Sequence, residues 1–216
     1  LTKRQRKYPI FNNAYMMTGS HHLYNYLPTK HEKWLTMIKQ EIIDSGLIVD
    51  ILNAKTMEDV FRLLQGCSFL GSFLAYQYTI DMNYSPYINF SENDFVKAGI
   101  GAIRGIKKCF LCYGNKCEDA IWYVKEHFND LQKRYGYTSF HPLLGHEPTL
   151  IDLQNCFCET DKYLRAKMPE LRIGNVRIKQ KYMPHTDPIQ FFFPPKWNIV
   201  EMYKYKPIVV PTLFDL

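Results

Sequence analysis

A glycine-rich stretch in the middle of the chain could bind a phosphate group. Gly99 and Gly101 flank Ile100, and Arg104 and Gly105 follow closely. A helix, a Gly-hydrophobic-Gly turn and a second helix are typical of a helix-hairpin-helix element, because glycines let the backbone approach a phosphate and the next helix presents free N–H groups to it. A plain linker between helices is the alternative. The phosphate-binding candidates are Gly99, Gly101, Arg104, Gly105, Lys107 and Lys108.

A second group of polar residues recurs at helical spacing near the end of the predicted helical region. Asp152, Asn155, Glu159 and Lys162 fall at i, i+3, i+7 and i+10, which places them in one stripe along a helix. A carboxylate near the start of a helix, followed by a carboxylate–lysine pair, could stabilise a developing cation or orient a water molecule. An exposed helix face with a weak salt bridge explains the same spacing.

A third group combines amides, a carboxylate and aromatic rings around the end of an apolar helix. Its members are Tyr76, Gln77, Asp81, Asn83 and Tyr84. Amides read the edge of a nucleobase and aromatic rings stack on its face, so the group could form a base pocket. Core tyrosines and a capping aspartate are the alternative interpretation.

Other chemistry is not indicated. The sequence contains no Gly-x4-Gly-Lys-Ser/Thr phosphate-binding loop. Three of its six cysteines, Cys109, Cys112 and Cys117, could supply metal ligands, but their spacing fits no standard zinc or iron–sulfur pattern. The histidines accompany no nucleophile motif. We therefore expect reduced thiols, no metal and no cofactor.

Composition indicates a globular chain with a mild basic surplus. The chain has 216 residues, 46% hydrophobic, and a formal net charge of +6, which is compatible with a polyanion partner. No stretch approaches the ~20 apolar residues of a membrane span, and the start does not resemble a signal peptide. We expect an intracellular protein, nuclear in a eukaryote and cytoplasmic in a bacterium or virus. Because Leu1 is not a methionine, we also expect a trimmed chain that lacks a neighbouring domain.

The elements that must position these residues are mostly helices. Hydrophobic periodicity and capping signals predict helices over residues 32–45, 56–66, 69–81, 91–96, 106–111, 118–134 and 150–167. Beyond Pro169, frequent prolines predict short strands or an extended tail. The expected architecture is an all-α domain over residues 1–168 with an irregular, Pro-rich tail over residues 169–216 packed on it.

Three runs of sequence together resemble a known family: FLAYQYTIDMNYS at 73–85, DFVKAGIGAIRGIKKCF at 94–110 and DLQNCFCETDKY at 152–163. They resemble the helical domain found with 5-hydroxymethyl-deoxyuridine DNA kinases, the α-glutamyl/putrescinyl thymine pyrophosphorylase group. That group is similar to helix-hairpin-helix DNA glycosylases. The resemblance covers roughly residues 10 to 165, and it implies a glycosylase-like helical fold and action on modified pyrimidines in double-stranded DNA.

The chain also departs from the family pattern. The opening run of residues 11–15 fits, but the arginine expected next is Met16, and the aspartate expected near Gly19 is missing. Such changes would alter the substrate or abolish activity. Ile103 stands about where lyase-competent glycosylases carry a lysine, which implies a monofunctional enzyme that uses water as the nucleophile.

The leading hypothesis is therefore a DNA glycosylase-like hydrolase that flips out a hydroxymethylated or hypermodified pyrimidine and cleaves its N-glycosidic bond. The catalytic candidates are Asp152, with Glu159 second, and Lys162; the base-pocket candidates are Gln77, Asp81, Asn83, Tyr76 and Asn155. Two alternatives stay open. One is a transferase that attaches an amino acid or polyamine to an activated pyrimidine in DNA, and the other is a non-catalytic DNA-binding module, which Met16 favours.

Overall fold

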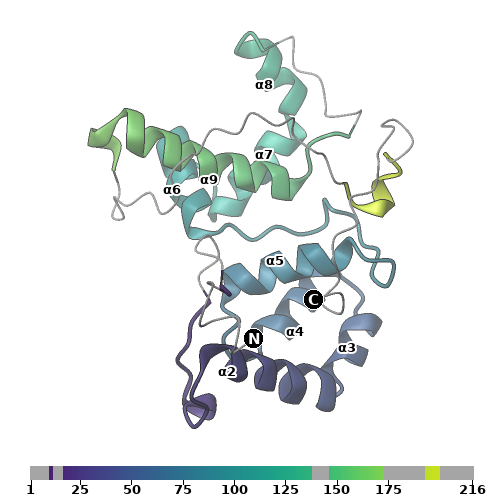
Figure 1. Cartoon of the computed structure of the whole chain (residues 1–216). Coiled ribbons are helices and arrows are strands. Elements are labelled where there is room, and N and C mark those ends of the chain that lie inside the picture. The colour runs from purple at the N-terminus through teal and green to yellow at the C-terminus, as the bar shows by residue number, and fades with distance from the viewer. Residues whose placement is uncertain (1–9, 12–16, 138–145, 173–192, 200–216) are drawn as a thin grey trace, which may run out of the picture.

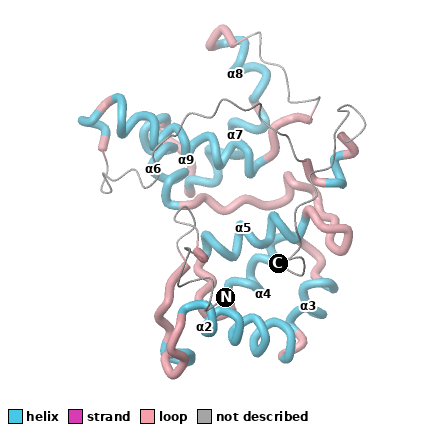
Figure 2. The backbone as a smooth tube through the Cα atoms, viewed as in Figure 1, coloured by secondary structure: helices cyan, strands magenta, loops and turns pink. Residues whose placement is uncertain are grey.

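The computed structural model describes residues 10–11, 17–137, 146–172 and 193–199, and the regular elements within these ranges are helical (Figures 1 and 2). They are η1 (His22–Tyr24), α2 (Lys30–Met37), the π-helix η2 (Ile38–Asp44), α3 (Leu47–Asn53), α4 (Met57–Gln65), α5 (Ser72–Asn83), α6 (Ile100–Cys109), α7 (Cys117–Glu126), α8 (Phe128–Arg134), α9 (Leu150–Lys167), η3 (Pro169–Leu171) and η4 (Pro195–Trp197). The described residues contain no β-strand. The all-α prediction is confirmed.

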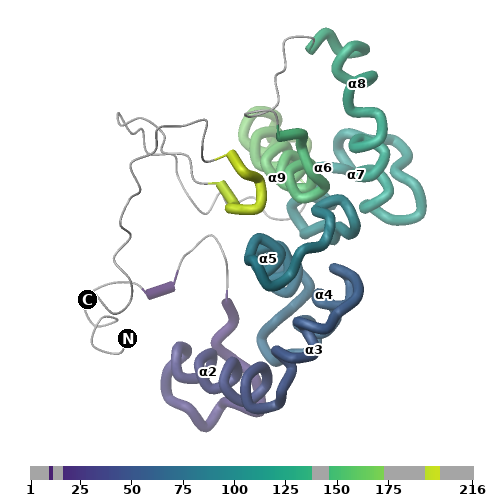
Figure 3. Tube along the Cα trace, turned by 90° about the vertical axis from the view of Figure 1, so that its right-hand side faces the viewer, coloured from purple at the N-terminus to yellow at the C-terminus, as the bar shows by residue number. Residues whose placement is uncertain are grey.

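The helices gather in two halves along the chain. Helices α2 to α5 form one half and α6 to α9 the other, as Figure 1 and the view turned by 90° in Figure 3 both show. The first half closes around buried side chains such as Trp34, Met37, Met57 and Phe61. No helix in the described part of the chain is long and apolar enough to cross a membrane.

Capping residues define several helix starts. Thr56 accepts a hydrogen bond from the Asp59 amide at 3.1 Å, and Asp59 accepts one from the Thr56 amide at 3.0 Å, so the predicted start of α4 is confirmed. Thr29 and Glu32 form the same reciprocal pair at the start of α2. Helix α9 begins and ends where the periodicity predicts.

The connection between the halves differs from the prediction. Residues 91–94 turn and residues 95–99 are extended, so the short helix predicted over 91–96 is wrong, and no helix precedes Gly99 to form a helix-hairpin-helix element. The extended run passes between the halves (Figure 1), where the Phe95 ring contacts Phe61 and Tyr76 at centroid distances of 5.2 and 5.8 Å.

Other boundaries shift for local reasons. Phe69 has a left-handed backbone (φ 66°), so α5 begins at Ser72 instead of Phe69. The helix expected from residue 106 already begins at Ile100. The single helix expected over 118–134 divides into α7 and α8 at His127, whose φ of −106° and ψ of 18° are not helical. Helix α3 was not predicted.

The predicted C-terminal tail lies largely outside the described residues. Its described parts are η3 and the segment 193–199, which contains η4. Lys196 of this segment contacts the loop that follows α5. The position of the tail as a whole stays a prediction.

Candidate functional site

Two of the predicted phosphate-binding glycines lie inside the contact between α6 and α9. A β-carbon on Gly101 would lie 2.4 Å from the Cys158 sulfur, and one on Gly105 would lie 2.0 Å from the Phe157 carbonyl oxygen. Both distances are far too short for real atoms. At Gly105 the clash is with backbone, so only glycine permits α9 to approach this closely, whereas at Gly101 the Cys158 side chain would have to move. The environment of Gly101 and Gly105 therefore explains them as helix-packing residues, and phosphate binding by them stays a prediction.

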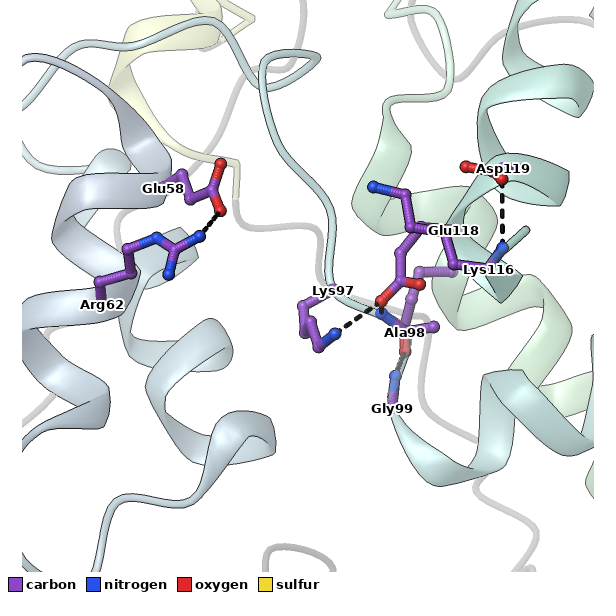
Figure 4. Close-up of polar contacts among 9 residues, drawn as sticks. Glu58, Arg62, Lys97, Ala98, Gly99, Lys116, Glu118 and Asp119 are labelled. Carbon is purple, nitrogen blue, oxygen red and sulfur yellow. Dashed lines mark hydrogen bonds and ion pairs between the residues drawn. The ribbon is translucent and has the colours of Figure 1, made fainter. Parts of the chain in front are cut away.

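The backbone amides just before α6 have side-chain partners. Glu118 of α7 accepts the Ala98 amide at 3.0 Å and pairs with Lys97 at 3.1 Å (Figure 4), and Gln154 of α9 accepts the Gly99 amide at 3.1 Å. Burial of Glu118 opposes its ionisation, but the hydrogen bonds from the Ala98 amide and Lys97 hold its pKa below the ordinary value. These contacts anchor the extended connection to α7 and α9.

Lys108, another predicted phosphate contact, points into the protein. Its ammonium group lies 2.5 Å from Asp161, and Arg165 lies 3.1 Å from the same carboxylate. The side chains of Lys108 and Asp161 are only 3% and 2% exposed. Lys108 therefore cannot reach DNA in this structure, whereas Arg104 is partly exposed and Lys107 is exposed on α6.

The polar stripe predicted on α9 has two distinct ends. Asp152 is partly buried at the start of the helix, where its Oδ2 atom accepts hydrogen bonds from the Thr149 amide at 2.8 Å and the Thr149 hydroxyl at 2.9 Å. Glu159 and Lys162 form an exposed pair at 2.5 Å, and the hydrogen bond to Glu159 raises the pKa of Lys162. Asn155 is exposed and accepts a hydrogen bond from Gln154.

The base-pocket candidates of α5 occupy different environments. Asn83 is 1% exposed, and its amide bonds both the amide and the carbonyl of Phe90, so it closes the loop after α5. Asp81 lies on the surface, although partial desolvation raises its pKa. Gln77 and Tyr84 are both partly exposed. They are seven residues apart, which is about two helical turns, so they lie on the same side at the end of α5.

The Asp152 carboxylate acts electrostatically on two tyrosines of this group. Burial chiefly raises the pKa of Tyr76, and the neighbouring Tyr84 and the Asp152 carboxylate raise it further. The pKa of Tyr84 is raised by burial, then by the Glu92 and Asp152 carboxylates. The start of α9 and the end of α5 thus lie within electrostatic range of each other. Tyr76 is only 1% exposed and belongs to the core. We call the partly exposed residues Gln77, Tyr84 and Asp152 the junction site.

Several residues at or near this junction had no signal in the sequence. Glu118 and Gln154 act on amides that are 20 and 55 residues away along the chain. Glu92 and Trp197, which are bonded to each other at 2.7 Å, are 105 residues apart. Such pairs follow from the fold, so local spacing does not reveal them.

A separate cavity lies in the first half. It has a volume of about 490 Å³ and lies between η2, α3 and α4, lined in part by Glu41, Asp50 and Cys67. Glu41 accepts hydrogen bonds from the Tyr24 hydroxyl at 2.5 Å and the Ser68 amide at 2.6 Å. None of the predicted site residues lines this cavity.

The sequence also singled out two positions near the start of the chain, Met16 and Gly19, and the six cysteines. Met16 lies outside the described residues, while Gly19 accepts a hydrogen bond from Lys33 at 3.0 Å through its carbonyl. All six cysteines are free thiols. Within the described ranges, no group of three or more His, Cys, Asp or Glu side chains could hold a metal ion.

The fold and these contacts define an all-helical domain with a polar junction between its halves. Over residues 1–173 the chain matches the family described as "5-hmdU DNA kinase, helical domain", and it belongs to that family, which is related to DNA modification. No curated protein and no solved structure matches the chain. The family description names a kinase, and the match does not support the glycosylase reaction or the similarity to glycosylases.

Proposed function

We propose that this chain binds DNA carrying a 5-hydroxymethylated pyrimidine and receives the modified base at the junction site. The family supports the substrate class, because its description names 5-hmdU DNA. The Asp152 carboxylate carries the proposal: it is partly buried on α9 and acts electrostatically on the partly exposed Tyr84, which follows α5. The sequence has no P-loop motif, so we assign base recognition, and not ATP binding, to this domain.

The chemistry of the junction site suits such a base. 5-Hydroxymethyluracil offers a ring N–H, two carbonyl oxygens and a hydroxyl group on its 5-substituent. A carboxylate such as Asp152 accepts a hydrogen bond from the ring N–H or the hydroxyl, and an amide such as Gln77 both donates and accepts. The partly exposed Tyr84 ring supplies stacking surface for a base that has left the duplex.

Basic side chains of α6 and of the segment before it are the contacts that we propose for the DNA backbone. Arg104 and Lys107 lie on α6. Gly99, the residue before this helix, lies next to the side chains of Phe73 and Gln154. The Lys97 side chain is 42% exposed beside the same helix start. Lysine and arginine contacts to phosphates release counterions, so binding through them weakens as salt rises.

The test is the affinity of the chain for matched duplexes that differ at one base. Fluorescence anisotropy would compare thymine, 5-hydroxymethyluracil and 5-hydroxymethylcytosine at two salt concentrations. We expect a preference of about tenfold for a hydroxymethylated duplex, the factor that one hydrogen bond to a charged group supports, and weaker binding at higher salt. Equal affinity for all three duplexes, or no binding, would overturn the proposal.

Hydrolysis of the N-glycosidic bond is a second candidate, favoured by one observation. The contacts described for Asp152 use Oδ2 only, so Oδ1 is free to orient a water molecule or face a sugar cation. Mass spectrometry after incubation with the three duplexes would detect a free base if the bond is cleaved. Asp152→Asn should abolish base release and leave DNA bound; base release at the wild-type rate would contradict this role. An intact, modified base would instead indicate transfer.

A further inference from the structure

A short C-terminal segment outside the family match is seated on the loop that follows α5. The family region ends at residue 173, whereas residues 193–199 pack on residues 83–92. The Lys196 ammonium group donates to the carbonyl oxygens of Asn83 at 2.9 Å and Phe90 at 3.3 Å. Ile199 is only 5% exposed. These contacts tie the segment to the turn that carries Tyr84.

Trp197 is the centre of this contact. Its indole N–H donates to the Glu92 carboxylate at 2.7 Å, and its ring meets the Tyr84 ring edge-on at a centroid distance of 6.0 Å. The His146 ring, which precedes α9, stacks on the indole at 3.6 Å. The tryptophan therefore connects the loop after α5 with the chain that leads into α9.

Glu92 stands between Trp197 and the junction site. Its Oε2 atom accepts the indole hydrogen bond, while its Oε1 atom is buried and has no hydrogen-bond partner among the described residues. The same carboxylate acts on the Tyr84 hydroxyl, whose pKa it raises after the effect of burial. Loss of the indole N–H would remove the hydrogen bond that fixes the partly buried Glu92 carboxylate beside Tyr84.

We propose that Trp197 is a positioning residue of the junction site: by holding Glu92 it fixes Tyr84 where Tyr84 meets the modified base. The segment 193–199 is then part of the unit that recognises DNA, in addition to the helical region matched by the family. This inference rests on the proposed function, because Tyr84 belongs to the site that receives the base.

The experiment measures the preference for a 5-hydroxymethyluracil duplex over a thymine duplex with the full chain. Trp197→Phe replaces the indole with a smaller aromatic ring that has no N–H, and we expect it to lower the preference about fivefold while the affinity for the thymine duplex changes less than twofold. Glu92→Ala should have the same effect. Glu92→Gln keeps an acceptor for the indole N–H and should retain the wild-type preference.

Trp34→Phe is the matched control. Trp34 is buried in the first half and donates its indole N–H to the Thr18 carbonyl at 2.8 Å, so this variant loses an equivalent hydrogen bond far along the chain from the junction site. Both tryptophan variants should unfold at a lower temperature, but only Trp197→Phe should lose preference. If both variants keep the wild-type preference, or if Glu92→Gln behaves like Glu92→Ala, the positioning role is wrong. If the wild-type chain itself shows no preference, the proposed function fails, and this inference fails with it.

Discussion

Helix α9 takes part in two contacts of opposite character. Against α6 it is packed so closely that Gly105 has no room for a β-carbon, and Lys108 and Asp161 form an ion pair away from water. At its first turn, Asp152 is partly exposed and acts electrostatically on Tyr84, which follows α5. The glycine motif therefore takes part in helix packing, while the residues that we propose for base binding lie at the start of α9 and the end of α5.

The largest expected effect is on the buried ion pair between α6 and α9. Asp161→Asn leaves Lys108 and Arg165 without their carboxylate and should cost about 3–5 kcal/mol of unfolding free energy, because an unpaired buried charge is poorly solvated. Glu159→Gln, on the same helix, removes an exposed pair and should cost under about 1 kcal/mol. Urea unfolding of both variants checks the difference. Equal losses would mean that the Lys108–Asp161 pair is not buried as described.

Close packing of the glycines predicts the next largest effect. Gly105→Ala should destabilise the chain by about 1–3 kcal/mol or more, since the added carbon meets backbone, which cannot rotate away. Gly101→Ala meets the Cys158 side chain and should cost less. Gly71→Ala, where a β-carbon meets nothing within 4 Å, is the control. Thermal unfolding would rank the three; a Gly105→Ala variant as stable as Gly71→Ala would contradict the packing role.

Sequence patterns predicted the elements that depend on local chemistry. The bounds of α9 and the Thr56 cap of α4 follow from residues within a few positions of one another. The helix predicted over 91–96 failed because the following amides of Ala98 and Gly99 bond to Glu118 and Gln154, which are distant in sequence. Local propensity cannot anticipate such partners.

The candidate site shows the same division. The residue types singled out Asp152, Tyr76 and Tyr84, and the Asp152 carboxylate raises the pKa of both tyrosines, although Tyr76 lies in the core. Spacing could not show that Lys108 forms a buried ion pair with Asp161, or that the Asn83 side chain is hydrogen-bonded to the Phe90 backbone. Nor could it connect Trp197 with Glu92, because the two are brought together only by the tertiary fold.

A smaller effect separates capping from binding at the junction. Thr149→Ala removes the hydroxyl that contacts Asp152 and should cost about 1 kcal/mol, the usual loss for a helix cap. Thr29→Ala removes the equivalent cap of α2 and should cost a similar amount. Only Thr149→Ala should also change the preference for modified DNA. If both variants bind like the wild-type chain, the cap is independent of the junction site.

The smallest expected effect is in the dependence of stability on pH. Because the folded pKa of Glu118 lies below the ordinary value of 4.5, its contribution to stability is present above that pH and is lost as the pH falls through the folded value. Glu118→Gln should therefore lose less stability than the wild type as the pH falls below about 5. Thermal unfolding at a series of acidic pH values would record the difference. Glu41→Gln should act in the same direction in the first half, where Tyr24 and Ser68 lower the pKa of Glu41 against the effect of burial. Unchanged acid limbs in both variants would contradict the assigned pKa directions.

The most direct test of the account compares the two contacts of α9 in one binding measurement. Affinities for 5-hydroxymethyluracil and thymine duplexes would be measured for Asp152→Asn, Tyr84→Phe and the double variant Arg104→Gln/Lys107→Gln. We predict that the first two lose the preference for the modified duplex, whereas the double variant binds both duplexes more weakly by the same factor. Preference that survives in Asp152→Asn and Tyr84→Phe, but disappears in the α6 double variant, would place base recognition at the glycine motif and contradict the account.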